Sequence, residues 1–497
     1  MPTEHFDVLI VGAGLSGIGA AYRLQEAFPG KRYAVLEGRA RIGGTWDLFK
    51  YPGIRCDSPM HTLSYSFRPW QERKAIAGGE AIRSYIESTA SEFGIDEHIR
   101  FKHRVRGAEW STATQKWTVE VEVGDADETC TYTCGFLFMC SGYYSYESGY
   151  MPDFPGSGSF KGRIVHAQTW PEDLDYRGKK VVVIGSGATA ATLVPAMAED
   201  AGHVTMLQRS PTYFRALPDE DQLANRLQKL LPSGLANSVV RWKNILLGIG
   251  FYQFCRRLPN KAKNVLLNGV SKQLATKSDL EKHFTPTYKP WDQRICAIPN
   301  SDFFAAIGSD RASVVTDTIE SFTENGIRLS SGQELEADII VAATGLNLES
   351  CGGTQIVVDG EVVRPGDQLF YKGVMVSGIP NFAVCLGYTN AAWTLRADLS
   401  ARYVCRVLEH MDSNGYGVAV PEHDSSSMDR KPTLDLKSGY VQRGADVHPK
   451  QGSQAPWFLR QNYLLDSMTA KFSDIEESMA FSKNNSRAER SPEPAHS

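Results

Sequence analysis

Two glycine-rich loops each stand between an apolar run and an amphipathic stretch. The first reads Gly12-Ala13-Gly14-Leu15-Ser16-Gly17, and the second reads Gly185-Ser186-Gly187-Ala188-Thr189-Ala190. The runs FDVLIV and KKVVVI before them predict buried strands, and the stretches after them predict helices. Glycine lets the backbone approach a pyrophosphate, and the free N–H groups of a helix N-terminus favour an anion. The strand–turn–helix context therefore predicts a dinucleotide site at each loop.

The strands that follow the two loops end in residues of opposite charge. YAVLE ends in Glu37, and a carboxylate there can accept hydrogen bonds from both hydroxyls of an adenosine ribose. HVTMLQRS ends near Arg209, whose guanidinium suits a 2′-phosphate, with Gln208 and Ser210 as secondary partners. We therefore predict FAD at the first loop and NADPH at the second. The loop residues expected at the cofactors are Gly12, Gly14, Ser16 and Gly17, and Gly185, Ser186, Gly187, Ala188 and Thr189.

Composition argues against several classes of protein. The net charge of −4 and the pI near 6.3 give no reason to expect a nucleic-acid partner. The nine cysteines include no CxxC pair and no Cys/His spacing typical of zinc, so we expect reduced thiols and no metal site. No signal peptide precedes the first apolar run, and no run of 18 apolar residues could span a membrane. These features predict a cytoplasmic protein.

The order of the patterns predicts an α/β protein with two Rossmann-like domains. The FAD domain should be split around the NADPH domain, because the first sheet needs a further strand and 382–387 can supply it. The Pro/Gly/Ser-rich segment 151–162 is typical of an interdomain linker. The predicted boundaries are 1–147 and 346–497 for the FAD domain, 148–218 and 291–345 for the NADPH domain, and 219–290 for a mostly helical insertion.

Two dinucleotide domains also occur in disulfide reductases. Those enzymes carry a redox-active CxxxxC pair on the helix that faces the flavin, whereas the corresponding region here holds only Cys56. Reduction of a disulfide is therefore disfavoured, and the flavin electrons need another acceptor.

Two longer motifs indicate what that acceptor is. Residues 160–171 read FKGRIVHAQTWP, which fits FxGxxxHxxxW(P/D). Residues 43–57 read GGTWDLFKYPGIRCD, which fits (A/G)GxWxxxx(F/Y)P(G/M)xxxD. Both resemble the fingerprints of type I Baeyer–Villiger monooxygenases, the class B flavoproteins. The resemblance continues through 290–300, 337–348 and 377–399, and these segments are similar to the mycobacterial ethionamide-activating branch of that family.

The resemblance implies a particular reaction. In this family NADPH passes a hydride to FAD, and O₂ then adds at the flavin C4a to give a peroxyflavin. The peroxide attacks a ketone, and the adduct rearranges to an ester or lactone, so the cofactors make and break the bonds. The protein must stabilise the oxyanion and exclude water. The expected substrates are small lipophilic ketones, and also soft sulfur centres such as sulfides and thioamides.

The resemblance also assigns roles to residues outside the loops. The active-site arginine of the family falls on Arg294, and Asp57 resembles the carboxylate that orients it. A surface arginine and a turn residue are the plain alternatives. Gly44, Thr45, Trp46 and Asp57 are expected beside the flavin, with a core tryptophan as the alternative for Trp46.

The 160–171 motif is expected at the hinge between the domains. His166 is better explained by hydrogen bonding across the hinge, which would couple rotation of the NADPH domain to catalysis, than by general-base chemistry. A purely structural histidine is the alternative. The fingerprint residues assigned to the hinge are Phe160, Gly162, His166, Trp170 and Pro171.

The helical insertion has an unusual charge balance. Positions 222–278 contain ten Lys or Arg and no Asp or Glu, interleaved with apolar runs such as ILLGIGFYQF. Two interpretations compete. The favoured one is a helical layer that buries its apolar face on the substrate cavity while its charges attract NADPH. The other is a peripheral contact with an anionic membrane.

Three functions remain open on the sequence. The leading one is an NADPH- and O₂-dependent Baeyer–Villiger monooxygenase. A flavin monooxygenase that oxidises mainly S or N is the first alternative, and the Trp-Pro ending together with Asp57 and Arg294 argues against it. A non-catalytic nucleotide sensor is the second alternative, and it would give no reason to keep Asp57 and Arg294 together.

Overall fold

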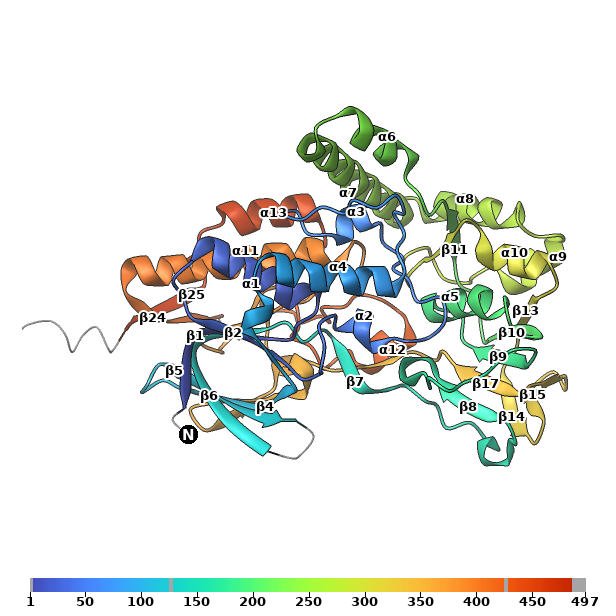
Figure 1. Ribbon diagram of the computed structural model, residues 1–497, viewed down its shortest axis with the longest axis horizontal. Coiled ribbons are helices and arrows are strands. Elements are labelled where there is room, and N and C mark those ends of the chain that lie inside the picture. Colours follow the sequence, from blue (N-terminus) through green and yellow to red (C-terminus); the bar gives the residue numbers. More distant parts are fainter. Residues whose placement is uncertain (1–2, 125–127, 424–427, 485–497) are drawn as a thin grey trace, which may run out of the picture.

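Two sheets carry the two glycine loops, and the strands beside each loop are parallel (Figure 1). The residues that the computed structural model describes are 3–124, 128–423 and 428–484. In the first sheet, β1 (Glu4–Val11) lies between β2 (Tyr33–Glu37) and β6 (Glu128–Met139), and the first loop leads from β1 into α1 (Leu15–Ala27). All of β2 is buried. Strands covered on both faces need continuous apolar runs, and the run FDVLIV in β1 meets this need.

A strand from late in the chain joins the first sheet. β23 (Phe382–Val384) pairs in parallel with β6, which confirms that the FAD domain is split. Helices α1, α4 (Gly79–Glu92) and α11 (Trp393–Asn414) pack on one face of the sheet. The remaining strands are β3 (Ile99–Phe101), β4 (His103–Ser111), β5 (Lys116–Val123), β19 (Gln355–Val358), β20 (Glu361–Val363), β21 (Phe370–Tyr371) and β22 (Met375–Val376).

The second sheet is built around the second glycine loop. This loop leads from β9 into α5 (Ala188–Met197). All neighbours in the sheet are parallel, as expected for a dinucleotide-binding unit. Its strands, in spatial order, are β13 (Ala312–Thr316), β10 (His203–Gln208), β9 (Lys180–Ile184), β17 (Ile339–Ala342) and β8 (Arg163–His166).

The chain crosses between the two sheets twice, along one short antiparallel pair. β7 (Tyr144–Gly149) leaves the first sheet, and β18 (Leu346–Leu348) returns beside it. The prediction that 151–162 is the linker is wrong. This segment already packs on the second domain, because Phe154 stacks on Phe322 of the hairpin formed by β14 (Ile319–Thr323) and β15 (Gly326–Leu329). Turn composition identified an irregular segment but not its packing.

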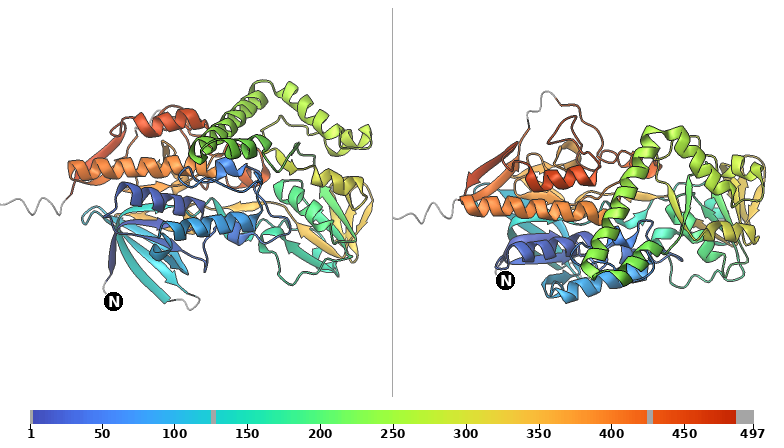
Figure 2. Two further views of the ribbon diagram at one scale, coloured as in Figure 1. Left: turned by 45° about the horizontal axis from the view of Figure 1, so that its top comes forward. Right: turned by 90° about the horizontal axis from the view of Figure 1, so that it is seen from above.

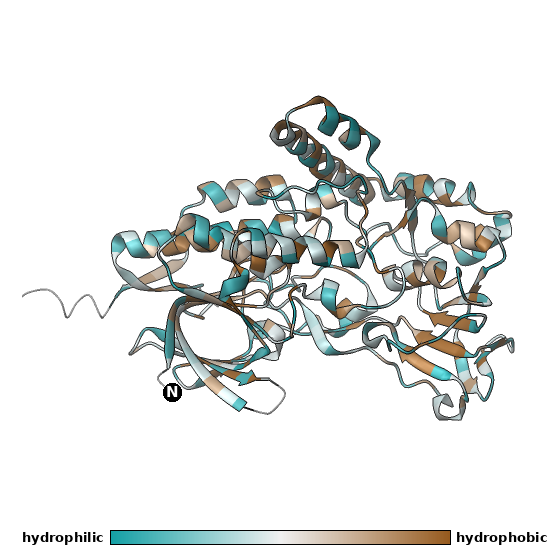
Figure 3. Ribbon diagram, viewed as in Figure 1, coloured by the Kyte–Doolittle hydropathy of each residue, from teal (hydrophilic) through white to brown (hydrophobic). Residues whose placement is uncertain are grey.

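The insertion is helical, as predicted. Its helices are α6 (Gln222–Leu230), α7 (Ser233–Arg257), α8 (Pro259–Ser271) and α9 (Lys277–His283). Figure 2 shows that α6 and α7 lie on the outside of the molecule, with α7 beside α13 (Tyr463–Phe472). Figure 3 shows hydrophobic residues along α7 although this helix stands at the surface. Among the helices of the described residues, none is long and apolar enough to cross a membrane.

Candidate active site

The first loop forms the tight turn that its glycines predict. Gly12 has φ +103°, and a β-carbon on it would be 2.7 Å from the carbonyl oxygen of Cys140. A β-carbon on Gly17 would be 1.8 Å from the carbonyl oxygen of Gly12. Larger residues at 12 and 17 are therefore excluded, and the N-terminus of α1 is left open toward a cavity. Gly12, Gly14 and Ser16 line this cavity, which has a volume of about 530 Å³.

Glu37 lies at the end of β2 beside the first loop. One carboxylate oxygen accepts from the backbone N–H of Ala13 at 2.7 Å, and the other accepts from that of Arg39 at 2.8 Å. Burial raises the pKa of Glu37, although these two N–H donors oppose the shift. The negative charge of the carboxylate is therefore only partly compensated within the protein. Ribose hydroxyls would supply further donors, so the residues fit the adenosine half of FAD.

The start of the 43–57 motif packs directly on the first loop. A β-carbon on Gly14 would be 3.5 Å from Cα of Gly44, so the two glycines are in contact. Thr45 and Trp46 belong to the short helix α2 (Thr45–Leu48) and line the cavity. The Thr45 hydroxyl hydrogen-bonds the Tyr144 hydroxyl at 2.5 Å. Trp46 is half-buried at the cavity and also packs against the core, so the two interpretations offered for it are compatible.

The second half of the same motif joins the two domains. Tyr51 lies against the side chain of Thr189 in α5. Gly53 has φ +74°, and a β-carbon on it would be 2.6 Å from Cβ of Ala196, also in α5. Arg55 forms a bidentate ion pair with Asp302 at the start of α10 (Asp302–Gly308). The motif therefore holds α5, the helix after the second glycine loop, against the site formed by the first loop.

The second loop has the same construction as the first. Gly185 has φ +139°, and a β-carbon on it would be 2.4 Å from the carbonyl oxygen of Ala343. Gly187 and Ala188 are exposed at the start of α5. The Ser186 hydroxyl donates to the carbonyl of Ser210 at 3.3 Å, which ties the loop to the end of β10. The open helix N-terminus and the residues after β10 thus form one surface, and it fits a dinucleotide phosphate.

The residues flanking this surface separate into two groups. Arg209 and Ser210 are exposed, and Arg209 makes no ion pair with the described residues. Gln208 departs from the expectation. It is buried, and its amide N–H groups donate to the carbonyl of His283 at 2.7 Å and to the Thr316 hydroxyl at 2.8 Å. Both donors are used inside the protein, so Gln208 offers none to a phosphate in this structure.

Asp57 and Arg294 face each other in the cavity. Oδ2 of Asp57 is 3.8 Å from Nη1 of Arg294, and Nη2 of Arg294 lies 3.5 Å from the carbonyl oxygen of Tyr388. Burial lowers the pKa of Arg294, but the negative charge of Asp57 opposes it and the net pKa is raised, so the guanidinium stays charged. The Arg294 side chain is 40% exposed, which leaves it accessible to a substrate.

The 160–171 motif runs along the edge strand β8 and the turn after it. Phe160 packs edge-on against Phe322, and a β-carbon on Gly162 would be 2.2 Å from the carbonyl of Asp338. These two positions support the second domain. Trp170 packs against Tyr176 in the core of the same domain, and Pro171 starts the following turn.

His166, at the end of β8, reaches the crossing strands. It is buried against Gly149, and Nδ1 accepts the N–H of Gln168 at 3.1 Å. The hydrogen bond across the crossing comes from Gln168, whose side-chain amide donates to the carbonyl of Ser145 at 2.9 Å. Burial lowers the pKa of His166, so a neutral ring is favoured at the crossing.

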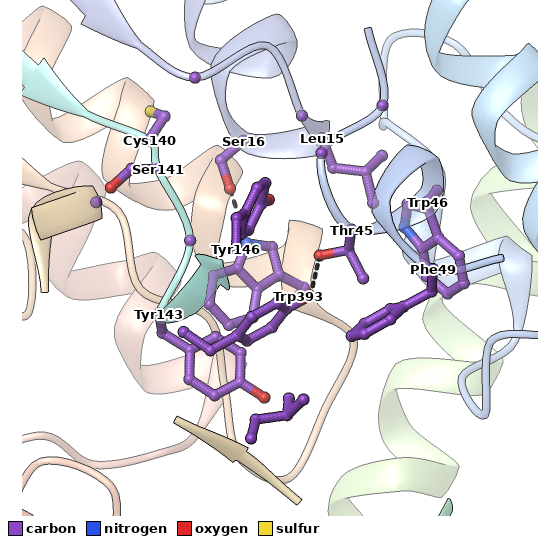
Figure 4. Close-up of a pocket in the computed structure, with 18 of the residues that line it drawn as sticks. Leu15, Ser16, Thr45, Trp46, Phe49, Cys140, Ser141, Tyr143, Tyr146 and Trp393 are labelled. Carbon is purple, nitrogen blue, oxygen red and sulfur yellow. Dashed lines mark hydrogen bonds between the residues drawn. The ribbon is translucent and has the colours of Figure 1, made fainter. Parts of the chain in front are cut away.

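The cavity connects the two dinucleotide sites. It is lined by Glu37 and the first loop at one end and by Ala188 and Thr192 of α5 at the other. Sequence reasoning missed several aromatic lining residues, of which Tyr143 and Trp393 stack with ring centroids 5.2 Å apart (Figure 4). The Trp393 indole N–H donates to the Ser16 hydroxyl at 2.7 Å. Tyr143 could have been predicted as a lining residue from its position directly after the turn that ends β6.

Comparisons with known proteins identify the family of the chain. A family model described as flavin-binding monooxygenase-like matches residues 65–413, and a model for an NAD(P)-binding Rossmann-like domain matches residues 10–73. The chain is 52% identical to the FAD-containing monooxygenase EthA of Mycobacterium tuberculosis over 97% of this chain and 98% of that protein. It is 46% identical to the probable FAD-binding monooxygenase AlmA of Acinetobacter baylyi over 99% of each.

Solved structures share the fold at low sequence identity. A steroid monooxygenase bound to NADP has a TM-score of 0.74 and 22% identity, covering 96% of this chain and all of that one. A cyclohexanone monooxygenase from Rhodococcus has a TM-score of 0.72 and 19% identity, with 97% and 100% coverage. The protein belongs to the flavin-binding monooxygenase-like family. The prediction of a flavoprotein monooxygenase that uses FAD and NADPH is thereby confirmed.

Proposed function

We propose that this protein is an NADPH- and O₂-dependent Baeyer–Villiger monooxygenase that converts lipophilic ketones into esters or lactones. The observation that carries the proposal is the Asp57–Arg294 pair, set in a cavity that reaches both dinucleotide loops. In the balanced reaction a ketone, O₂, NADPH and one proton give an ester, NADP⁺ and water. Bound FAD would supply the electron transfer and the activation of O₂.

The chain contributes charge and orientation to this reaction. Attack on a carbonyl places negative charge on its oxygen, and the Arg294 guanidinium is a fixed cation in the cavity where that charge would develop. Asp57 orients the guanidinium without neutralising it, because the two groups are 3.8 Å apart rather than in tight contact. The aromatic side chains of Tyr143 and Trp393 line the same cavity and would help to exclude water from it once the cofactors are bound.

The cofactor assignments rest on the two loops. Gly12, Gly14, Ser16, Gly17 and Glu37 would hold the adenosine and pyrophosphate of FAD. Gly44, Thr45, Trp46 and Asp57 would lie beside its flavin end. Gly185, Ser186, Gly187, Ala188, Thr189, Arg209 and Ser210 would hold NADPH. The exposed guanidinium of Arg209 would contact the 2′-phosphate, because a forked donor suits a phosphate dianion.

Oxidation of sulfur or nitrogen is the second candidate. Such an oxidation transfers oxygen to a lone pair and creates no tetrahedral oxyanion, so it makes less use of a cation in the cavity. The half-exposed Arg294 therefore favours the ketone reaction, while sulfides and thioamides remain expected secondary substrates.

One experiment separates these functions. The purified yellow protein is incubated with NADPH, O₂ and a panel of linear and cyclic ketones, with an aryl methyl sulfide in parallel, and the products are identified by gas chromatography and mass spectrometry. Esters or lactones formed in proportion to NADPH consumed are the expected result. Sulfoxide without any ester would favour the heteroatom oxidase, and no NADPH oxidation with any substrate would favour the nucleotide sensor.

The insertion has a second proposed role. Among the described residues that line the cavity, none belongs to 219–290, so this cavity gives no support to the favoured expectation that the layer covers the substrate. We propose instead that the insertion supports a peripheral contact with membranes.

A further inference from the structure

Two helices from distant parts of the chain expose one stripe of apolar side chains each. On α7 the stripe consists of Leu235, Val239, Trp242 and Leu246, and on α13 it consists of Leu465, Met468 and Phe472. Spacings of three and four residues place each set on one side of its helix. Exposed fractions reach 60% for Met468 and 70% for Phe472, which is unusual for groups that normally lie inside a protein.

The two stripes belong to one surface, which we name the α7–α13 face. The rings of Trp242 on α7 and Tyr463 at the start of α13 are 6.0 Å apart. The views of Figure 2 place the two helices side by side on the same side of the molecule. Leu223 and Leu230 are 50% and 79% exposed on α6, the helix that packs against α7.

The charges around this face have mostly one sign. Positions 222–278 contain ten basic residues and no acidic one. Arg226, Lys229 and Arg257 are exposed, and none of them forms an ion pair with a described residue. Acidic residues occur at Asp474 and Glu476, just beyond the end of α13. The insertion side of the face therefore presents apolar groups bordered by unneutralised cations.

We propose that the α7–α13 face docks on an anionic lipid bilayer. Leu, Trp, Met and Phe side chains would enter the boundary between headgroups and acyl chains, while the cations of the insertion would contact lipid phosphates. A second copy of this chain is a poorer partner, because two-fold pairing of the face would bring like charges together. The docking itself does not depend on the proposed oxygenation chemistry.

The buried sides of both helices support the two halves of the Asp57–Arg294 pair. On α7, Arg241 donates to the carbonyl of Ser64 at 2.8 Å, directly after the helix α3 (Met60–Leu63) that follows Asp57. On α13, Asp466 accepts the Tyr388 hydroxyl at 2.7 Å, and the carbonyl of Tyr388 is the one that faces Arg294. A bilayer on this face would therefore lie against two helices whose buried sides contact segments next to the Asp57–Arg294 pair.

Flotation of the full-length holoenzyme tests the docking. The probes are vesicles of phosphatidylcholine alone and vesicles of phosphatidylcholine with phosphatidylglycerol, at low and at high salt. The wild-type protein should float with the anionic vesicles at low salt, and high salt should release it. Trp242→Ser combined with Met468→Ser should reduce the bound fraction at least tenfold. Val362→Ser is the matched control, because Val362 is 57% exposed on β20, away from the face, and should bind like wild type.

Each other outcome overturns the proposal. Absence of flotation with anionic vesicles, or equal binding by the double variant and wild type, would exclude the face as a lipid site. A concentration-dependent dimer that only the double variant loses, without lipid binding, would identify the face as a contact between copies of the chain. FAD content and melting temperature verify that the variants fold. Because flotation requires no turnover, its failure is distinguishable from a failure of the proposed reaction.

Discussion

The imidazole of His166 fills the space beside Gly149 that a side chain would need. A β-carbon on Gly149 would lie 1.8 Å from Cε1 of His166 and 2.5 Å from both ring nitrogens. Gly149 ends the strand that leaves the first domain, and His166 ends an edge strand of the second. The fingerprint histidine therefore makes a packing contact at the point where the chain crosses between the domains.

Gly149→Ala should disturb that crossing. The methyl group must displace a buried ring, and overpacking of this kind typically costs about 1–3 kcal/mol. We expect a lower melting temperature and a slower NADPH-dependent flavin reduction, with FAD content little changed. Gly158→Ala in the nearby segment is the control, because a β-carbon there meets nothing within 4 Å. Equal behaviour of the two variants would show that the contact at Gly149 does not restrict the domains.

The sequence predicted those parts of the site that depend on local backbone geometry. A glycine in a tight turn, or a charged residue at the end of a strand, can be recognised from the local sequence without knowing the rest of the fold. Gln208 shows where the local argument failed. Gln208 and the two residues before it in β10 are buried, whereas Arg209 and Ser210, beyond the end of the strand, are exposed. Adjacent positions in the sequence did not reveal which of these side chains reach solvent.

Other parts depended on tertiary packing and could not be predicted from patterns. Helical spacing identified α7 as a helix with an apolar side, but nothing in it indicated that this side would remain uncovered. The meeting of Asp57 and Arg294 across the two domains followed from family resemblance rather than from spacing. The link from Arg294 through Tyr388 to Asp466 was not predicted, because family resemblance in the segments of Arg294 and Tyr388 does not say which of their groups meet in space.

Arg209→Ala should weaken NADPH far more than NADH. Loss of a charged hydrogen bond to the 2′-phosphate is expected to cost about 1.5–3 kcal/mol, mainly in the KM for NADPH. Steady-state oxidation of both coenzymes measures the difference. Arg311→Ala removes another exposed arginine from the same domain and should alter neither KM. Equal losses with NADPH and NADH would show that Arg209 does not contact the phosphate.

His448 should make the folded state sensitive to mild acid. Its Nε2–H donates to the carbonyl of Tyr143 at 3.2 Å, and burial lowers the pKa of His448 from 6.5 to about 4. Because the pKa of His448 is lower in the folded state than in the unfolded state, its contribution to the free energy of unfolding is fully present above pH 6.5. This contribution is lost as the pH falls toward 4. The loss should approach about 3 kcal/mol. His448→Gln should flatten the pH dependence of the urea unfolding midpoint over that interval, and an unchanged slope would contradict the assignment.

Arg294→Ala should separate flavin reduction from oxygen transfer to the ketone. The hydride can still arrive, because neither loop is altered, but the negative charge that develops on the carbonyl oxygen loses its cation. Ester formation should fall by about 10²–10³-fold, the usual effect of losing one oxyanion-stabilising donor. NADPH consumption should continue and release hydrogen peroxide instead. Stopped-flow absorbance of the flavin, measured beside the ester yield, distinguishes the two steps.

Two further variants test whether charge or geometry carries this effect. Arg294→Lys keeps a cation but loses the planar fork, so it should recover part of the ester yield if charge dominates. Asp57→Ala should follow the Arg294→Ala pattern more weakly, because Asp57 acts through the guanidinium that it orients at 3.8 Å. All three variants should retain FAD, since the first loop and Glu37 are untouched. Normal ester yield from Arg294→Ala would place the catalytic cation elsewhere and refute the active site proposed for this protein.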